Sequence, residues 1–99
     1  MREMVIPYAF IVSSPDGSAY RARVIGHERA DGIWEGVIEF SRDKTRLVTK
    51  IETTQPNAGA LEYWAMGLEE AYVENALTRA RDMSRPLPSS VFRAPSPRV

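Results

Sequence analysis

A single histidine with nearby carboxylates is the first place in this sequence to look for chemistry. His27 is the chain's one histidine, and its candidate partners are Glu28, Glu35 and Glu52. Histidine and carboxylate side chains together can bind a metal ion or transfer a proton near neutral pH. A lone histidine beside carboxylates on a strand is more often a surface hydrogen-bonding residue. The cluster therefore does not by itself predict a catalytic centre.

Motifs that mark well-known chemistries are missing from the sequence. The 99 residues include no cysteine, so we expect no disulfide, thiol nucleophile or cysteine metal site. There is also no HExxH zinc motif, phosphate-binding glycine loop or G-x-S-x-G nucleophile elbow. The sequence therefore predicts a protein that is not an enzyme and that holds no cofactor and no metal ion.

Three basic residues are the candidates for contact with a ligand or a nucleic acid: Arg21, Arg23 and Lys50. Pairing of the predicted strands places Glu39 between Arg23 and Lys50, where its carboxylate would neutralise the centre of the strip. The aromatic residues that could stack on bases are expected in the core. The polar segment 52–56 could also hold a ligand, although a strand end followed by a capping turn explains it better.

Charge is unevenly distributed along the chain, although 13 basic and 13 acidic residues give a net charge of zero. Residues 1–83 contain ten basic residues against all 13 acidic ones, a net charge of −3, and residues 84–99 carry +3. A mildly acidic body lacks the basic face through which duplex-DNA binders gain from counterion release. The charge pattern therefore argues against nucleic acid as a partner.

Length and composition indicate one small domain with an appended tail. Hydrophobic residues make up 43% of the chain and charged residues 26%, which suits one globular domain over residues 1–83. Residues 84–99 contain four prolines, four serines and no acid, and we expect them to form a disordered tail that could bind a protein partner. The apolar run near the N-terminus is too short for a signal peptide or a membrane span. We therefore expect a cytoplasmic protein with no membrane contact.

Turn signals divide the first half of the chain into four predicted strands. The turns are Ser14-Pro15-Asp16-Gly17, Ala30-Asp31-Gly32 and the segment 43–46. The strands between them cover residues 5–13, 18–27, 33–41 and 47–54. Their short connections predict an antiparallel meander.

Alternating apolar residues predict how these strands pair, because a slip of one residue would turn every side chain to the opposite face. One choice of register per hairpin places a single set of side chains on the core face, among them Tyr8, Phe10, Val12, Trp34, Ile38, Phe40, Thr49 and Ile51. The same registers set Gly26 opposite Gly36, which leaves a hollow in the sheet. We expect Trp64 from the helix to fill this hollow; the alternative is a pair of twist glycines with nothing against them.

A single long helix over residues 57–83 is predicted to follow the strands, with Asn57 as its N-cap. Leu61, Trp64, Leu68 and Tyr72 recur at helical spacing and form a core stripe. A second apolar stripe lies on the opposite side of this helix and consists of Tyr63, Met66, Val73 and Leu77. Two apolar faces need two partners, and one sheet covers only one of them. The prediction is an α+β domain in the order ββββα with its helix on one face of the sheet.

Two runs of sequence resemble a small family of uncharacterised bacterial proteins. They are ERADGIWEG at residues 28–36 and ETTQP at residues 52–56, within a likeness that extends over residues 8–80. That family implies no activity.

A second likeness is to the HicB-like antitoxins. It lies in the opening hairpin, with Asp16, Gly17 and Tyr20, and in the segment 68–71 followed by residues 75–76. This resemblance implies a role in binding a toxin protein.

The functional expectation follows from the second helical stripe. We expect a non-enzymatic protein–protein interaction module that forms a homodimer through Tyr63, Met66, Val73 and Leu77, because exposed apolar patches on small domains mark interfaces. The alternative is an antitoxin-like or nucleic-acid-binding regulatory protein.

Overall fold

The computed structural model describes residues 2–83, which form an antiparallel sheet and two helices. The order is β1 (Glu3–Ser13), β2 (Ala19–Glu28), β3 (Trp34–Arg42), β4 (Thr45–Val48), β5 (Thr53–Gln55), α1 (Ala58–Met66), α2 (Glu70–Arg79) and β6 (Arg81–Asp82). The predicted α+β class and antiparallel sheet are confirmed. The sheet has six strands rather than four, and two short helices replace the single long one. The predicted tail, residues 84–99, lies outside the described residues.

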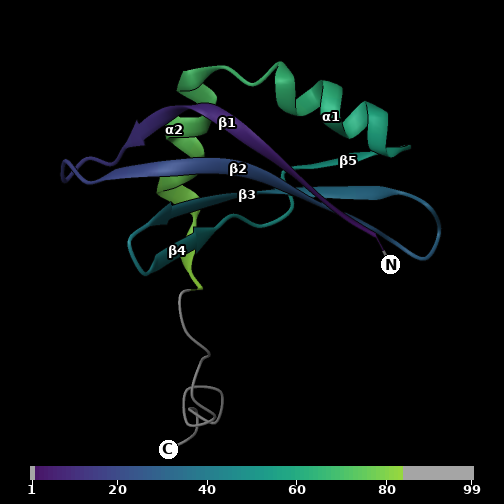
Figure 1. Ribbon diagram of the computed structural model, residues 1–99, viewed down its shortest axis with the longest axis horizontal. Helices are drawn as coiled ribbons and strands as arrows, with labels where there is room; N and C mark the ends of the chain where they lie inside the picture. The colour runs from purple at the N-terminus through teal and green to yellow at the C-terminus, as the bar shows by residue number, and fades with distance from the viewer. Residues whose placement is uncertain (1, 84–99) are drawn as a thin grey trace, which may run out of the picture.

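The sheet is ordered β1-β2-β3-β4-β6, and β5 pairs with β3 beyond the end of β4. In Figure 1, α2 crosses the strands steeply while α1 lies near β5. Both helices contribute to the same core, which also contains Val12, Val24, Ile38 and Phe40 from the sheet. No helix within residues 2–83 is long and apolar enough to cross a membrane.

The central hairpin has the predicted register. Gly26 pairs with Gly36 and Val24 with Ile38 between β2 and β3. The Ser14–Gly17 turn also forms as expected, with Gly17 at φ +88°. Glycine adopts this left-handed conformation without the steric penalty of other residues.

The first hairpin departs from the predicted register because β1 contains a bulge. Val12 pairs with Tyr20 as expected, but the register shifts between Pro7 and Ile11, so that Ile6 rather than Tyr8 lies opposite Val24. Extra residues on one strand interrupt its ladder and bend it. The predicted core position of Phe10 is therefore wrong, since its side chain is 58% exposed.

The third hairpin is tighter than predicted and its second strand is split. Arg42 pairs with Thr45 around a two-residue turn in which Asp43 has φ +51°. This turn shifts β4 by two residues, so Val48 rather than Lys50 lies opposite Glu39. The ladder is then interrupted where the Thr49 hydroxyl accepts a hydrogen bond from the Ile38 N–H at 3.0 Å.

The predicted fourth strand is divided into two separate strands, β4 and β5. Residues 49–52 connect β4 to β5, and β5 pairs with the start of β3. Thr49 is buried as predicted, whereas Ile51 is 53% exposed and does not take its predicted place on the core face.

Leu61, and not Trp64, fills the hollow between Gly26 and Gly36. A Cβ atom added at Gly36 would lie 2.8 Å from Cδ1 of Leu61, and one added at Gly26 would clash with Cδ2 of the same side chain. Leu61 is fully buried. The two glycines therefore let the first half of α1 approach the sheet closely.

The predicted long helix is broken at Gly67, the C-cap of α1. Asn57 caps α1 as predicted, since its side chain accepts a hydrogen bond from the Ala60 N–H at 2.8 Å. At the other end the Gly67 N–H bonds back to the carbonyls of Tyr63 and Trp64. Glu69 then has an extended backbone, with φ −88° and ψ 152°. The chain therefore changes direction before α2 begins.

The break also explains where the second apolar stripe goes. On a straight helix Val73 and Leu77 would share an outer face with Tyr63 and Met66. Because α2 has its own direction, it turns Val73 and Leu77 into the core, where they are 1% and 5% exposed. The prediction that these four residues form one exposed stripe is therefore wrong.

The end of the predicted helix is a short strand instead. Arg81 and Asp82 form β6, which pairs with β4, and the Met83 N–H donates to the Arg46 carbonyl at 2.6 Å. The described chain thus ends at the sheet edge opposite β1.

Candidate functional site

The predicted histidine cluster assembles only in part. His27 lies opposite Glu35 in the sheet and lines one hollow with Glu28 and Glu35, whereas Glu52 lies elsewhere. His27 lies 3.7 Å from Glu3, Glu28 pairs with Arg2 at 2.8 Å, and Glu52 belongs to a separate group with Arg79. Glu35 lies 3.6 Å from Arg29. Within residues 2–83 no three histidine, cysteine, aspartate or glutamate side chains are grouped so that they could hold a metal ion.

A buried carboxylate lies on the sheet face opposite the helices. Glu39 is 2% exposed, and its two carboxylate oxygens accept hydrogen bonds from Arg23 and Arg46 on the neighbouring strands. Burial raises the pKa of Glu39, but the hydrogen bonds and charges of the two arginines outweigh burial and hold the pKa below its usual range. Arg46, which lies opposite Ser41 in β4, supplies the second cation in place of the predicted Lys50.

The three candidate contact residues do not form one basic strip. Arg21 and Arg23 line a shallow hollow beside the β1 bulge, and Arg23 is engaged by Glu39. Lys50 lines a different hollow together with Arg79 and Arg81. The described residues therefore do not bring Arg21, Arg23 and Lys50 together around one hollow. Contact with a ligand or nucleic acid at these residues stays a prediction.

An aromatic cleft of about 530 Å³ opens where the two helices diverge. It is lined by Gln55, Ala60, Tyr63, Trp64, Gly67, Leu68, Glu69 and Tyr72. The rings of Trp64 and Tyr72 are perpendicular, with their centroids 6.3 Å apart. Tyr63 is 81% exposed at the rim. The cleft depends on the helix break, because Trp64 and Tyr72 come from different helices.

The Tyr72 ring is held from outside the cleft by charged neighbours. Its hydroxyl donates to Glu52 at 2.6 Å, and Arg79 donates to the same carboxylate oxygen at 2.6 Å. The hydrogen bond to Glu52, with burial, raises the pKa of Tyr72 above its ordinary value. The guanidinium of Arg79 also lies 5.8 Å from the centre of the Tyr72 ring. This network fixes the ring that closes one side of the cleft.

The edge strand β1 is a second candidate surface. It pairs with β2 on one side and ends the strand order on the other. The Arg2 carbonyl accepts from the Glu28 N–H, so even-numbered residues of the first half of β1 direct their backbone groups toward β2. Glu3, Val5 and Pro7 therefore direct theirs away from the sheet. Proline suits such an outward position, because it has no N–H to donate.

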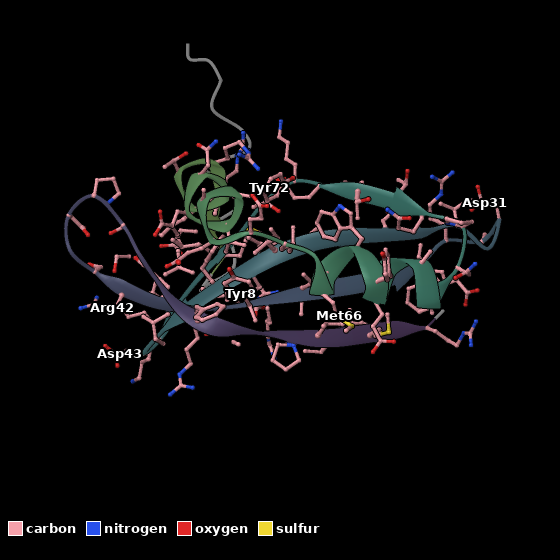
Figure 2. All side chains as sticks on the ribbon, turned by 90° about the horizontal axis from the view of Figure 1, so that it is seen from above. Tyr8, Asp31, Arg42, Asp43, Met66 and Tyr72 are labelled. Atoms are coloured by element: carbon pink, nitrogen blue, oxygen red, sulfur yellow. The ribbon has the colours of Figure 1, made fainter. Side chains whose placement is uncertain are left out.

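Apolar side chains accompany this edge of β1, which no other strand of residues 2–83 covers. Val5 is 47% exposed on the strand, and Met66 is 74% exposed on α1. α1 packs against β1, and Figure 2 shows Met66 on the side of α1 toward that strand. Of the four predicted interface residues, Tyr63 and Met66 are thus exposed, and Val73 and Leu77 belong to the core.

The sequence reasoning missed both the cleft and the edge. A signal for the edge was available, because a meander places its first strand at one side and Pro7 lies within it. The cleft had a weaker signal in Gly67, which costs a helix about 1 kcal/mol relative to alanine.

Comparison with known proteins does not extend these observations. No protein-family model matches the chain. No curated protein matches it, and no solved structure does. Function is therefore inferred from the geometry of this chain.

Proposed function

We propose that the protein is a non-enzymatic protein–protein interaction module and that two copies pair through their β1 edges. One observation carries the proposal: the first half of β1 has backbone groups directed away from the sheet. Exposed Val5 lies on the sheet face away from the helices, and exposed Met66 lies on α1, which packs against β1 on the other face. A free, apolar strand edge favours pairing with another strand. The self-association expected from the helix is thereby reassigned to the strand, with α1 at its side.

Antiparallel pairing about a twofold axis at Val5 suits this edge. The two copies of Val5 would exchange N–H and C=O hydrogen bonds, and the Glu3 N–H of each copy would donate to the Pro7 carbonyl of the other. Pro7 contributes an acceptor only, so its missing N–H is tolerated. The twofold rotation keeps both α1 helices on the same face of the combined sheet. It places the two Met66 side chains on either side of the axis.

The second half of β1 is less suited to pairing. The bulge between Pro7 and Ile11 breaks the even alternation that a partner strand needs. Residues 3–7 are paired regularly with β2 and precede the bulge. This difference places the axis at Val5 and leaves exposed Phe10 and Ile11 outside the paired segment.

Replacing Val5 by proline tests the proposal directly. The Val5 N–H faces away from β2, so Val5→Pro removes a bond between copies and none within the chain. Light scattering after size-exclusion chromatography should give twice the 11.1 kDa chain mass for the wild type and the single-chain mass for Val5→Pro. Met66→Glu should shift the equilibrium in the same direction, because it would bring two carboxylates close to the axis.

Val5→Thr is the matched control, because threonine keeps the N–H, the β-branch and the preference for strands. It should remain dimeric. Circular dichroism should show the wild-type sheet and helix signal for all three variants. A wild-type protein that stays monomeric at every concentration, or a Val5→Pro variant that is folded and still dimeric, would overturn the proposal.

A further inference from the structure

The aromatic cleft combines ring faces with negative charge. Glu69 is the charged residue in its lining, and within residues 2–83 its carboxylate takes part in no ion pair or hydrogen bond. Gly67, at the C-terminal end of α1, also lines the cleft. That end of a helix carries partial negative charge, and α1 has no basic residue in its last turn to balance it. The N-terminal end of α2, whose N-cap is Glu69, carries the opposite partial charge and offsets that of the α1 end. The full negative charge of Glu69 then decides the balance, and the cleft favours a cation.

The rings specify what kind of cation suits the cleft. Trp64 and Tyr72 meet at a right angle, and Tyr63 stands at the rim. Aromatic faces attract cations through their quadrupole, and the attraction is stronger when water is excluded. Net binding is therefore most favourable for a cation whose hydration is weak. A lysine ammonium is a compact, strongly hydrated charge that needs several acceptors. A methylated ammonium spreads its charge over an apolar surface. It therefore suits a cleft that is lined by aromatic rings and has few hydrogen-bond acceptors.

We propose that the aromatic cleft binds a trimethylammonium group, with Tyr63, Trp64 and Tyr72 against its methyl surface and Glu69 as counter-charge. The volume of about 530 Å³ lies within the range of small-ligand pockets and leaves room for the rest of a ligand. Arg79 already lies 5.8 Å from the Tyr72 ring centre, which shows that this ring accommodates a cation. Arg79 itself lines the neighbouring hollow rather than the cleft.

This inference does not depend on pairing of β1. Val5 and Met66 do not line the cleft, and the cleft residues do not lie on the strand edge. The two proposals can therefore fail separately, and a Val5→Pro monomer should bind the same cation as the wild type.

Titration of the full chain with tetramethylammonium and with choline tests the site. The indole N–H of Trp64 should shift saturably in ¹H–¹⁵N NMR spectra, with Kd in the millimolar range for so small a ligand. Trp34 is 3% exposed and should not shift, so it serves as an internal reference. The neutral isostere of choline, in which a tert-butyl group replaces trimethylammonium, should bind at least about fivefold more weakly.

Two variants and one matched control assign the binding to the cleft. Tyr63→Ala and Glu69→Gln change exposed side chains and should each weaken binding about threefold to tenfold. Glu62→Gln removes an exposed carboxylate of α1 that does not line the cleft, and it should leave Kd unchanged. The proposal would be overturned if the neutral isostere bound as tightly as choline or if the Trp64 signal showed no saturable shift. It would also be overturned if neither cleft variant changed Kd.

A short peptide with a trimethyl-lysine side chain distinguishes two sources of the group. Binding about tenfold tighter than tetramethylammonium would identify a modified protein as the ligand. Binding of choline that is equal to or tighter than that of the peptide would identify a free small molecule. Either result supports the site, and failure of both ligands to bind would refute it.

Discussion

Glu39 is a carboxylate buried in the sheet and hydrogen-bonded by two arginines on adjacent strands. Replacing it by glutamine puts an amide between two guanidinium donors and leaves one of them without an acceptor. Glu39→Gln should lower the free energy of unfolding by about 2 kcal/mol, measured by urea denaturation at pH 7. Glu35→Gln is the control, since its pair with Arg29 at 3.6 Å is partly exposed and should contribute less than about 1 kcal/mol.

The same residue makes stability depend on pH. Its pKa is lower in the folded chain than the ordinary value of 4.5, because the two arginines outweigh the effect of burial. The stabilisation is therefore complete above the ordinary pKa and is lost as pH falls through the lower folded-state pKa. The wild type should lose more stability than Glu39→Gln between pH 7 and pH values below that range. Equal losses in the two proteins would show that the ionised carboxylate is not what stabilises the sheet.

Helix α1 is positioned by the close approach of Leu61 to Gly26 and Gly36. A Cβ atom at position 36 would lie 2.8 Å from Leu61 and 3.0 Å from Thr53. Leu61 is fully buried, and the Thr53 hydroxyl accepts a hydrogen bond from the Gln55 side chain. Gly36→Ala should therefore destabilise the fold by about 1–3 kcal/mol, as overpacked cores generally do. Thermal unfolding followed by circular dichroism measures the effect.

Gly59→Ala provides the comparison within the same helix. A Cβ atom there would meet Asn57 Oδ1 at an ordinary 3.4 Å, and the position is exposed. The substitution should stabilise the protein by up to about 1 kcal/mol, because alanine has the higher helix propensity. If both alanine variants change stability by the same amount and sign, the close contact at Leu61 is not what limits position 36.

Strand pairing could be predicted from the sequence where the residue pattern fits only one register. Strict alternation around Gly26 and Gly36 admits one register, and that register is observed. The break near Gly67 was not predictable in this way, because Val73 and Leu77 fit the periodicity of a straight helix as well as that of a separate one. The β1 bulge was hidden for a similar reason, since Tyr8 and Phe10 keep the alternation that the bulge interrupts.

The candidate sites were harder to predict than the elements. Trp64 and Tyr72 occur on one stripe of the expected straight helix, where they would have been core residues. They form a cleft because two helices diverge, and the angle between helices is set by packing rather than by local sequence. The β1 edge, in contrast, follows from strand order alone. Its outward groups could have been assigned once Pro7 was recognised as an edge residue.

Pairing of β1 edges between two copies would couple folding to association. A partner that binds the folded chain and not the unfolded one raises apparent stability by mass action. The wild-type midpoint of thermal unfolding should therefore rise with protein concentration, whereas that of Val5→Pro should stay constant. Calorimetric scans over a wide concentration range, with Val5→Thr beside them, measure this difference. A concentration-independent midpoint for the wild type would contradict it.

The position of β6 has a practical consequence. Because β6 pairs with β4 while β1 ends the opposite side of the sheet, the chain enters and leaves the described fold at opposite borders. A bulky fusion partner joined ahead of Arg2 would sit next to the segment proposed to pair and would act as a steric cap on it. The same fusion joined directly after Met83 would lie at the β6 border and leave that segment accessible. Comparing the two attachment points therefore tests assembly without changing a residue of the described fold.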